Sequence, residues 1–251
     1  SPTSQTTETP RKVYLSSPTS RAELSALSPA ADDAPSDSNI KSVRVASGDH
    51  ANPVDNTLLQ RLLLNYMGYN ITQYNQNTKT ADIIKTFDSG KNKSMGGVVH
   101  SLPVSMVSKA TITDGQYVPE ETYVLFGAMD NALHVVKQSD GTEVLSYFPR
   151  EVLGHKGQYK SIVPGLTADE TKNENMPSFG VDAPWETYAS YSRQVTADKL
   201  ETITADKLYA FGGARMGAKA YYGLDLTGIH KQNGFKPKQM FTITPTTSSA
   251  F

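Results

Sequence analysis

Short runs of apolar and aromatic residues, separated by polar and glycine-rich turns, dominate the chain from residue 96 onward. Runs of four to eight such residues between turn signals predict β-strands rather than helices. Asp140-Gly141 predicts a type I′ turn, because that turn needs positive φ at both central positions. Gly213, Met216 and Gly217 predict a second turn. The expected strands cover residues 98–104, 122–128, 133–137, 144–149, 207–213 and 220–226.

The chain predicts one convincing helix, over residues 55–67. Asp55 or Asn56 is suited to its N-cap, and Gly68 is suited to its C-terminal end. The apolar residues that recur at helical spacing are Leu58, Leu59, Leu62, Leu63 and Tyr66. This stripe is expected to pack against a sheet, with a role in binding a partner helix as the alternative.

The remaining segments differ from the strand-rich part in composition. Residues 1–40 are rich in Ser, Thr, Pro and Ala and are expected to be mostly flexible, except for a short strand over residues 12–15 that adds to a sheet edge. Residues 151–195 are expected to form a long loop, and residues 231–251 a Thr/Ser-rich tail. The sheet-forming domain is therefore expected over residues 41–230.

Two strand pairs in this domain look alike. Residues 122–137 and 207–226 each hold an aromatic-aliphatic strand that ends in Gly, then a turn, then a second strand. Loose repetition of such a meander is typical of a β-propeller, although the spacing of about 85–90 residues is roughly twice that of a common blade. We therefore expect an all-β, partial propeller with long connections.

Composition narrows the possible functions. Lys plus Arg number 24 and Asp plus Glu number 25, so the net charge of -1 gives no basic surface for nucleic acid. No apolar run reaches the roughly 20 residues of a membrane-spanning helix. The absence of cysteine excludes disulfides, thiol catalysis and cysteine zinc sites.

Five histidines are the first candidates for chemistry. His100 and His134 lie at matching positions near strands and could bind a metal as a pair, but no third ligand follows at suitable spacing. Packing or hydrogen bonding is therefore the preferred interpretation, and His134 should lie on the opposite sheet face from Leu133. The other histidines are expected at the surface: His50, His155 and His230.

Three further features have both a structural and a functional interpretation. Asp130 and Asn131 are expected to shape a turn rather than to act as catalytic groups, because their side chains bond their own backbone and tolerate left-handed φ. Trp185, the single tryptophan, either binds a ligand or fixes a loop to the sheet. The glycines at 212, 213 and 217 lie between strands and are expected to form a turn rather than a phosphate site.

Five segments stand out in order along the chain. They are Val99-His100-Ser101-Leu102-Pro103-Val104, the hairpin from Val124 to Val136 with its core Gly127-Ala128-Met129-Asp130-Asn131-Ala132-Leu133-His134, the strand from Gly141 to Pro149, Phe179-Gly180-Val181-Asp182-Ala183-Pro184, and the run from Gly212 to Thr227. Taken together, they resemble the C-terminal β-propeller of the PilC/PilY family of type IV pilus tip-associated biogenesis and adhesion proteins. The match spans about residues 94–227.

The resemblance implies a modified, quinoprotein-like β-propeller and a role in pilus extension, retraction and surface attachment. It implies minor pilins and a host-cell or surface receptor as partners, and a location at the bacterial cell surface or pilus tip. The family's calcium loop, Asp-x-Asp/Asn-x-Asp, does not occur in this sequence. We therefore predict no cofactor, metal site or catalytic residue, and no enzyme activity, and the ligand-binding residues stay unknown.

Two alternatives stay open. A quinoprotein-like propeller enzyme would need cofactor contacts and a calcium-bound Asp base, and absorbance in the near ultraviolet would detect a bound quinone. A generic extracellular, calcium-stabilised binding module would melt at a higher temperature with added calcium, because a ligand that binds only the folded state stabilises it.

Overall fold

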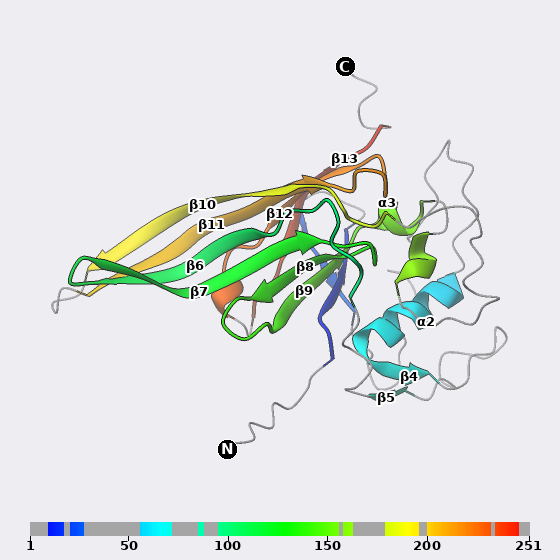
Figure 1. Ribbon diagram of the computed structural model, residues 1–251, viewed down its shortest axis with the longest axis horizontal. Helices are drawn as coiled ribbons and strands as arrows, with labels where there is room; N and C mark the ends of the chain where they lie inside the picture. The colour runs from blue at the N-terminus through cyan, green and yellow to red at the C-terminus, as the bar shows by residue number, and fades with distance from the viewer. Residues whose placement is uncertain are drawn as a thin grey trace.

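A computed structural model of the chain describes residues 10–17, 21–27, 56–71, 85–87, 95–155, 158–162, 179–195, 200–231 and 234–245. Eleven of the described strands form one curled sheet. The fold is all-β, and the curled sheet forms a half-barrel that is consistent with a partial, propeller-like architecture (Figure 1). The expected fold class is thus confirmed.

The sheet order is β2-β13-β12-β11-β6-β7-β8-β9-β1-β3. The strand β10 pairs with the edge of β11 that is opposite to β12 and β6. Apart from the parallel pair of β1 and β9, the neighbouring strands are antiparallel. The strands of this sheet are β1 (Val13–Leu15), β2 (Ala22–Glu23), β3 (Ser25–Ala26), β6 (Val104–Thr113), β7 (Gln116–Gly127), β8 (Leu133–Lys137), β9 (Glu143–Phe148), β10 (Trp185–Val195), β11 (Glu201–Gly213), β12 (Tyr221–Asp225) and β13 (Lys238–Ile243).

The elements outside the sheet are α2 (Asn56–Met67), α3 (Arg150–Leu153), the 3₁₀ helices η3 (Gln158–Ser161) and η4 (Ile229–Lys231), and a separate pair of strands, β4 (Tyr69–Ile71) and β5 (Lys85–Phe87). The predicted helix is confirmed within one residue of its expected start. Gly68 has a φ of 103°, as a C-terminal glycine requires. Asp55, the candidate N-cap, lies outside the described residues.

The N-terminal strands join the two ends of the curled sheet. β1 pairs with β9, so the prediction of an edge strand over residues 12–15 is confirmed. The segment that follows pairs with both ends, because β3 bonds β1 while β2 bonds β13. The described part of the segment predicted to be flexible therefore contributes to the sheet, and the predicted domain boundaries stay predictions.

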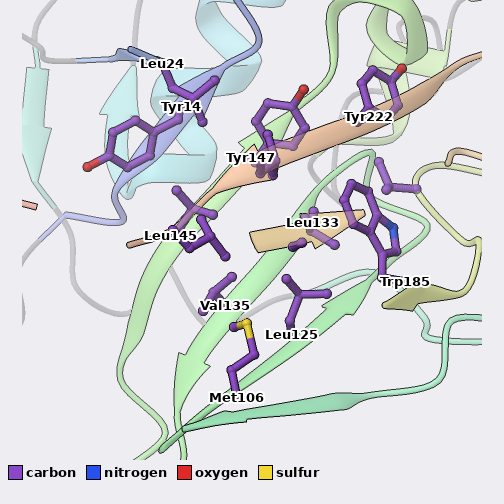
Figure 2. Packing of buried hydrophobic residues seen from close by; sticks show 14 of the residues in the cluster. Tyr14, Leu24, Met106, Leu125, Leu133, Val135, Leu145, Tyr147, Trp185 and Tyr222 are labelled. Carbon is purple, nitrogen blue, oxygen red and sulfur yellow. The ribbon is translucent and has the colours of Figure 1, made fainter. Parts of the chain in front are cut away.

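Two buried clusters lie on opposite faces of the sheet. The larger lies in its concave side, where side chains from β6 to β9, β11 and β12 converge (Figure 2). In this cluster Trp185 stacks on Tyr222 at a ring-centroid distance of 6.4 Å. The smaller cluster joins the leucines of α2 to β1, Phe148 and η3, which confirms that the helix packs against the sheet.

Four long strands extend beyond the larger cluster as a β-arm, with β10, β11, β6 and β7 side by side (Figure 1). In the distal half of the arm, residues 116–120 of β7 and 191–195 of β10 are all exposed. The turn at its tip, Asp114-Gly115, has φ of 50° and 77°, which is the two-residue type I′ geometry.

Four local predictions were wrong. Residues 98–103 are not a strand, and residues 185–195 of the expected loop form β10. The expected tail contains β13, which pairs with β12. At Asp140-Gly141 only Gly141 has a positive φ, of 73°, because the loop is longer and Gly141 N–H bonds back to the carbonyl of Lys137.

Candidate functional site

One end of the sheet brings several of the candidate residues together. The carboxylate of Asp182 accepts backbone N–H bonds from Val99, His100 and Ser101, at 3.2, 2.7 and 3.0 Å. Its other oxygen lies 2.5 Å from Nδ1 of His100. These contacts explain why residues 98–103 form no strand: three successive N–H groups turn toward one carboxylate instead of joining a ladder.

The same end links two further segments of the resemblance, those that contain Ala128 and Gly217. The N–H of Val181 bonds the carbonyl of Ala128, at 2.9 Å. Buried Gln158 accepts from the N–H of Gly180 at 3.0 Å and donates to the carbonyl of Gly217 at 2.8 Å. Segments far apart in the sequence thus form one hydrogen-bonded junction. Gln158 had no signal in the sequence, because its partners come from distant loops.

The His100–Asp182 pair resembles two members of a Ser-His-Asp catalytic triad, with a buried carboxylate that orients a half-exposed imidazole. The neighbouring hydroxyl does not complete it. Ser101 is buried, and its Oγ accepts a 2.8 Å bond from the N–H of Gly127. The pair therefore fixes the loop rather than activating Ser101.

His134 lies in a buried network of alternating charges. Its Nε2 is 3.2 Å from Oδ1 of Asp130, and its Nδ1 is 2.6 Å from Oε1 of Glu143. Arg11, before β1, then donates to both oxygens of Glu143, at 2.6 and 2.9 Å. The guanidinium of Arg11 also lies 3.9 Å from the ring centroid of Tyr66 in α2. The network thus connects the N-terminal segment, the sheet and the helix.

The network shifts the pKa values of its members. Burial by itself would lower the pKa of His134, but the bonds to Asp130 and Glu143 outweigh it and raise the pKa to about 9. Burial would likewise raise the pKa of Glu143, but His134 and Arg11 lower it to about 2. A doubly protonated imidazole has no lone pair for a metal. The described residues contain no group of three or more potential ligands that could hold a metal ion.

The predicted turn at Asp130 and Asn131 is confirmed. Asn131 has a φ of 74°, and its Nδ2 donates to the carbonyl of Gln158 at 2.6 Å. Asp130 accepts from the N–H of Ala132 within the turn, at 3.3 Å, and from the N–H of Gly96 at 3.0 Å. Both residues are buried and satisfy groups of the surrounding loops.

The remaining candidates are the other histidines and Trp185. His134 lies away from Leu133, on the face of the ion network, as expected. The surface prediction for His155 was wrong, because it is buried beside α3. His230 is partly buried and its Nδ1 lies 2.7 Å from Oγ of Ser108. His50 lies outside the described residues.

Trp185 is buried in the main cluster, so it fixes β10 to the sheet rather than facing solvent.

The sequence interpretation missed a row of aromatic rings on the convex sheet face. Neighbouring ring centroids along this row are 6.0 to 6.4 Å apart. We name the row the aromatic platform: Tyr188, Tyr209, Phe211, Phe241 and Tyr221. Tyr188 and Tyr221, at its two ends, are 52% and 47% exposed. Alternation along β11 could have shown that Tyr209 and Phe211 share a face opposite Leu208 and Ala210.

A charged hollow adjoins the aromatic platform. Its volume is about 490 Å³, and it is lined by Arg21, Asp225, Lys238, Gln239, Met240 and Phe241. Asp225 is the cross-strand partner of Tyr209, and Lys238 is the partner of Asp225. Partners across antiparallel strands share a face. The hollow therefore lies on the same face of the sheet as the platform.

Comparison of the chain with protein-family models, with curated proteins and with solved structures finds no match. In the part of the chain that the structure describes, no helix is long and apolar enough to cross a membrane.

Proposed function

We propose that this chain is a non-enzymatic, tip-associated factor of type IV pili that supports pilus biogenesis and surface attachment. The observation that carries the proposal is the junction at the end of the sheet. Four of the five segments that resemble the PilC/PilY family contact one another there, through Asp182, Gln158 and the Ala128–Val181 bond. The fifth, from Gly141 to Pro149, joins them through the pairing of β9 with β8. Contacts among the matched segments support the view that they resemble the family as one structural unit rather than as separate short motifs.

The state of the ionisable groups supports binding rather than catalysis. His134 and Asp130 are buried, Glu143 is partly buried, and His134 bonds both carboxylates. The features that face solvent are instead a β-arm and an aromatic sheet face, which are surfaces for recognition. On this proposal the partners are minor pilins and a host-cell or surface receptor, and the protein acts at the bacterial cell surface or pilus tip.

The direct test is an in-frame deletion of the gene in the bacterium that encodes the chain. We expect fewer surface pili by electron microscopy, smaller twitching zones and weaker surface attachment, with each defect restored by the intact gene. Unchanged pili, twitching and attachment in the deletion strain would contradict the proposal.

A second measurement separates the proposal from a quinoprotein enzyme. The purified protein should show only the near-ultraviolet absorbance of its aromatic residues. An additional band that disappears on denaturation and extraction would indicate a bound quinone and would argue for the enzyme.

A further inference from the structure

We infer that the aromatic platform and the adjoining hollow form a binding site for an acidic saccharide, meaning a sugar chain whose pyranose rings carry carboxylates. The inference deepens the proposed adhesive function and rests on it for the biological role of the ligand. Its structural basis is separate, because none of the residues that form the site belongs to the buried junction or to the ion network.

Phe241, in the platform, packs against the sheet. A Cβ atom at Gly223 would lie 2.5 Å from Cε1 of Phe241, so this ring lies directly against the backbone of β12. The planes of Phe211 and Tyr221 are each within 15° of the plane of Phe241, at centroid distances of 6.1 and 6.4 Å. At such distances near-parallel rings are offset rather than face to face. These three rings are therefore close to parallel and form the flat part of the platform, whereas the plane of Tyr209 is turned by 76° from that of Phe211.

A flat π surface suits the apolar face of a sugar ring. The face of an aromatic ring is electrostatically negative, and the C–H groups of a pyranose carry partial positive charge. The three near-parallel rings, Phe211, Phe241 and Tyr221, have neighbouring centroids 6.1 and 6.4 Å apart, so this part of the row is already longer than one sugar unit. An oligosaccharide matches this length better than a single sugar.

The hollow adds charge selectivity at one end of the platform. Its volume of about 490 Å³ lies within the range of about 300–1,000 Å³ for small-molecule sites. Arg21 and Lys238 bring two positive charges to its lining, against one negative charge from Asp225. An arginine pairs with a carboxylate through two parallel hydrogen bonds. The excess of positive charge therefore favours a carboxylated sugar over a neutral one.

A polypeptide is the competing ligand for this region. Within the described residues β10 pairs with β11 alone, and its free edge contains no proline and no lysine to discourage a further strand. A strand added at that edge would lie next to Tyr188, with β10, β11 and β12 between it and β13, the strand that carries Lys238. The charged hollow would then have no role, so the observations favour the saccharide.

The test uses trigalacturonic acid and its methyl ester, which keeps the sugar rings and removes the charges. Isothermal titration calorimetry on the full chain at low salt should show binding of the acid and at least tenfold weaker binding of the ester. Phe241→Leu keeps an apolar side chain but removes the ring, and should weaken the binding of both ligands at least tenfold. The double variant Arg21→Gln, Lys238→Gln should weaken only the acid, to the affinity of the ester.

Two matched variants serve as controls. Tyr117→Ala removes an exposed ring from the β-arm, and Lys219→Gln removes an exposed charge near the β11–β12 turn, so neither should change saccharide binding. Circular dichroism should show that every variant is folded. Absence of acid binding by the folded chain, or equal effects of the control and platform variants, would overturn the inference. Binding of extended peptides in place of the sugar, abolished by Phe241→Leu, would overturn it too.

The experiments can reject the saccharide site and the pilus role independently of each other. Loss of pili in the deletion strain together with no saccharide binding would reject the inference and keep the proposed function. Saccharide binding by the purified chain together with unchanged pili and attachment in the deletion strain would support the inference and reject the proposed function.

Discussion

At the scale of single residues, the buried charges around His134 determine much of the stability of this region. Asp130, His134, Glu143 and Arg11 alternate in sign along a chain of contacts between 2.6 and 3.2 Å. Removing one member of a buried ion network is costly, because it leaves its partner as an uncompensated buried charge. The network therefore makes stability depend on pH.

The shifted pKa values give the pH window. His134 has a pKa of about 9 when folded, against 6.5 as its ordinary value, so its contribution is complete below pH 6.5 and is lost as the pH rises to 9. Glu143 has a pKa of about 2, against 4.5, so its contribution is complete above pH 4.5 and is lost as the pH falls to 2. We expect the melting temperature to be highest between pH 4.5 and 6.5.

His134→Gln tests this assignment. The variant should lose on the order of 3 kcal/mol of stability, or roughly 10 °C in melting temperature, because neutral Gln leaves buried Asp130 without a cationic partner and Glu143 with Arg11 alone. Its melting temperature should also no longer fall between pH 6.5 and 9. His230→Gln, at a partly buried histidine outside the network, should keep the fall. A wild-type melting temperature that is constant from pH 6.5 to 9 would contradict the prediction.

At the scale of elements, β1 is the strand on which the N-terminal part of the sheet depends. It covers the edge of β9 and carries Arg11 to Glu143. Deletion of residues 1–20 should therefore lower the melting temperature and increase aggregation, because β9 becomes an unpaired edge. Differential scanning calorimetry and light scattering measure the two effects.

A shorter truncation controls for the loss of chain. Deletion of residues 1–9 keeps Arg11 and β1, so it should leave both readouts close to those of the full chain. If the two truncations were equally stable and equally monomeric, β1 would not be needed to protect the edge of β9.

At the scale of the whole molecule, stability is distributed unevenly between the curled sheet and the β-arm. The concave side of the sheet is filled by the main cluster, whereas the distal arm exposes residues 116–120 and 191–195. Strands without a buried face open more readily than strands that pack against a core. Backbone amides of the distal arm should therefore exchange hydrogen faster than those of β8 and β9.

Hydrogen-exchange mass spectrometry of the isolated chain measures this difference directly. Peptides from residues 110–120 should exchange at least tenfold faster than peptides from residues 133–148. Equal protection of the two regions would mean that the arm is covered in solution, for example by a second copy, which chromatography coupled to light scattering would detect.

The sequence by itself determined the elements whose signals are local. The helix over Asn56–Met67, the strand over Leu133–Lys137 and the left-handed turn at Asn131 follow from periodicity and from the backbone preferences of adjacent residues. These features depend on a few neighbouring side chains, which the sequence gives directly. The all-β class follows from the repeated short apolar runs after residue 96, which are equally local.

The tertiary structure alone decided which distant residues meet. The pattern of Trp185–Val195 is too polar to predict a strand until β11 pairs with it, and His155 is buried by packing that its own neighbours do not encode. The ion network joins residues 11, 130, 134 and 143, and the aromatic platform draws on four strands. Both depend on strand register, which is set by pairing between segments far apart in the chain and so cannot be read from any one of them.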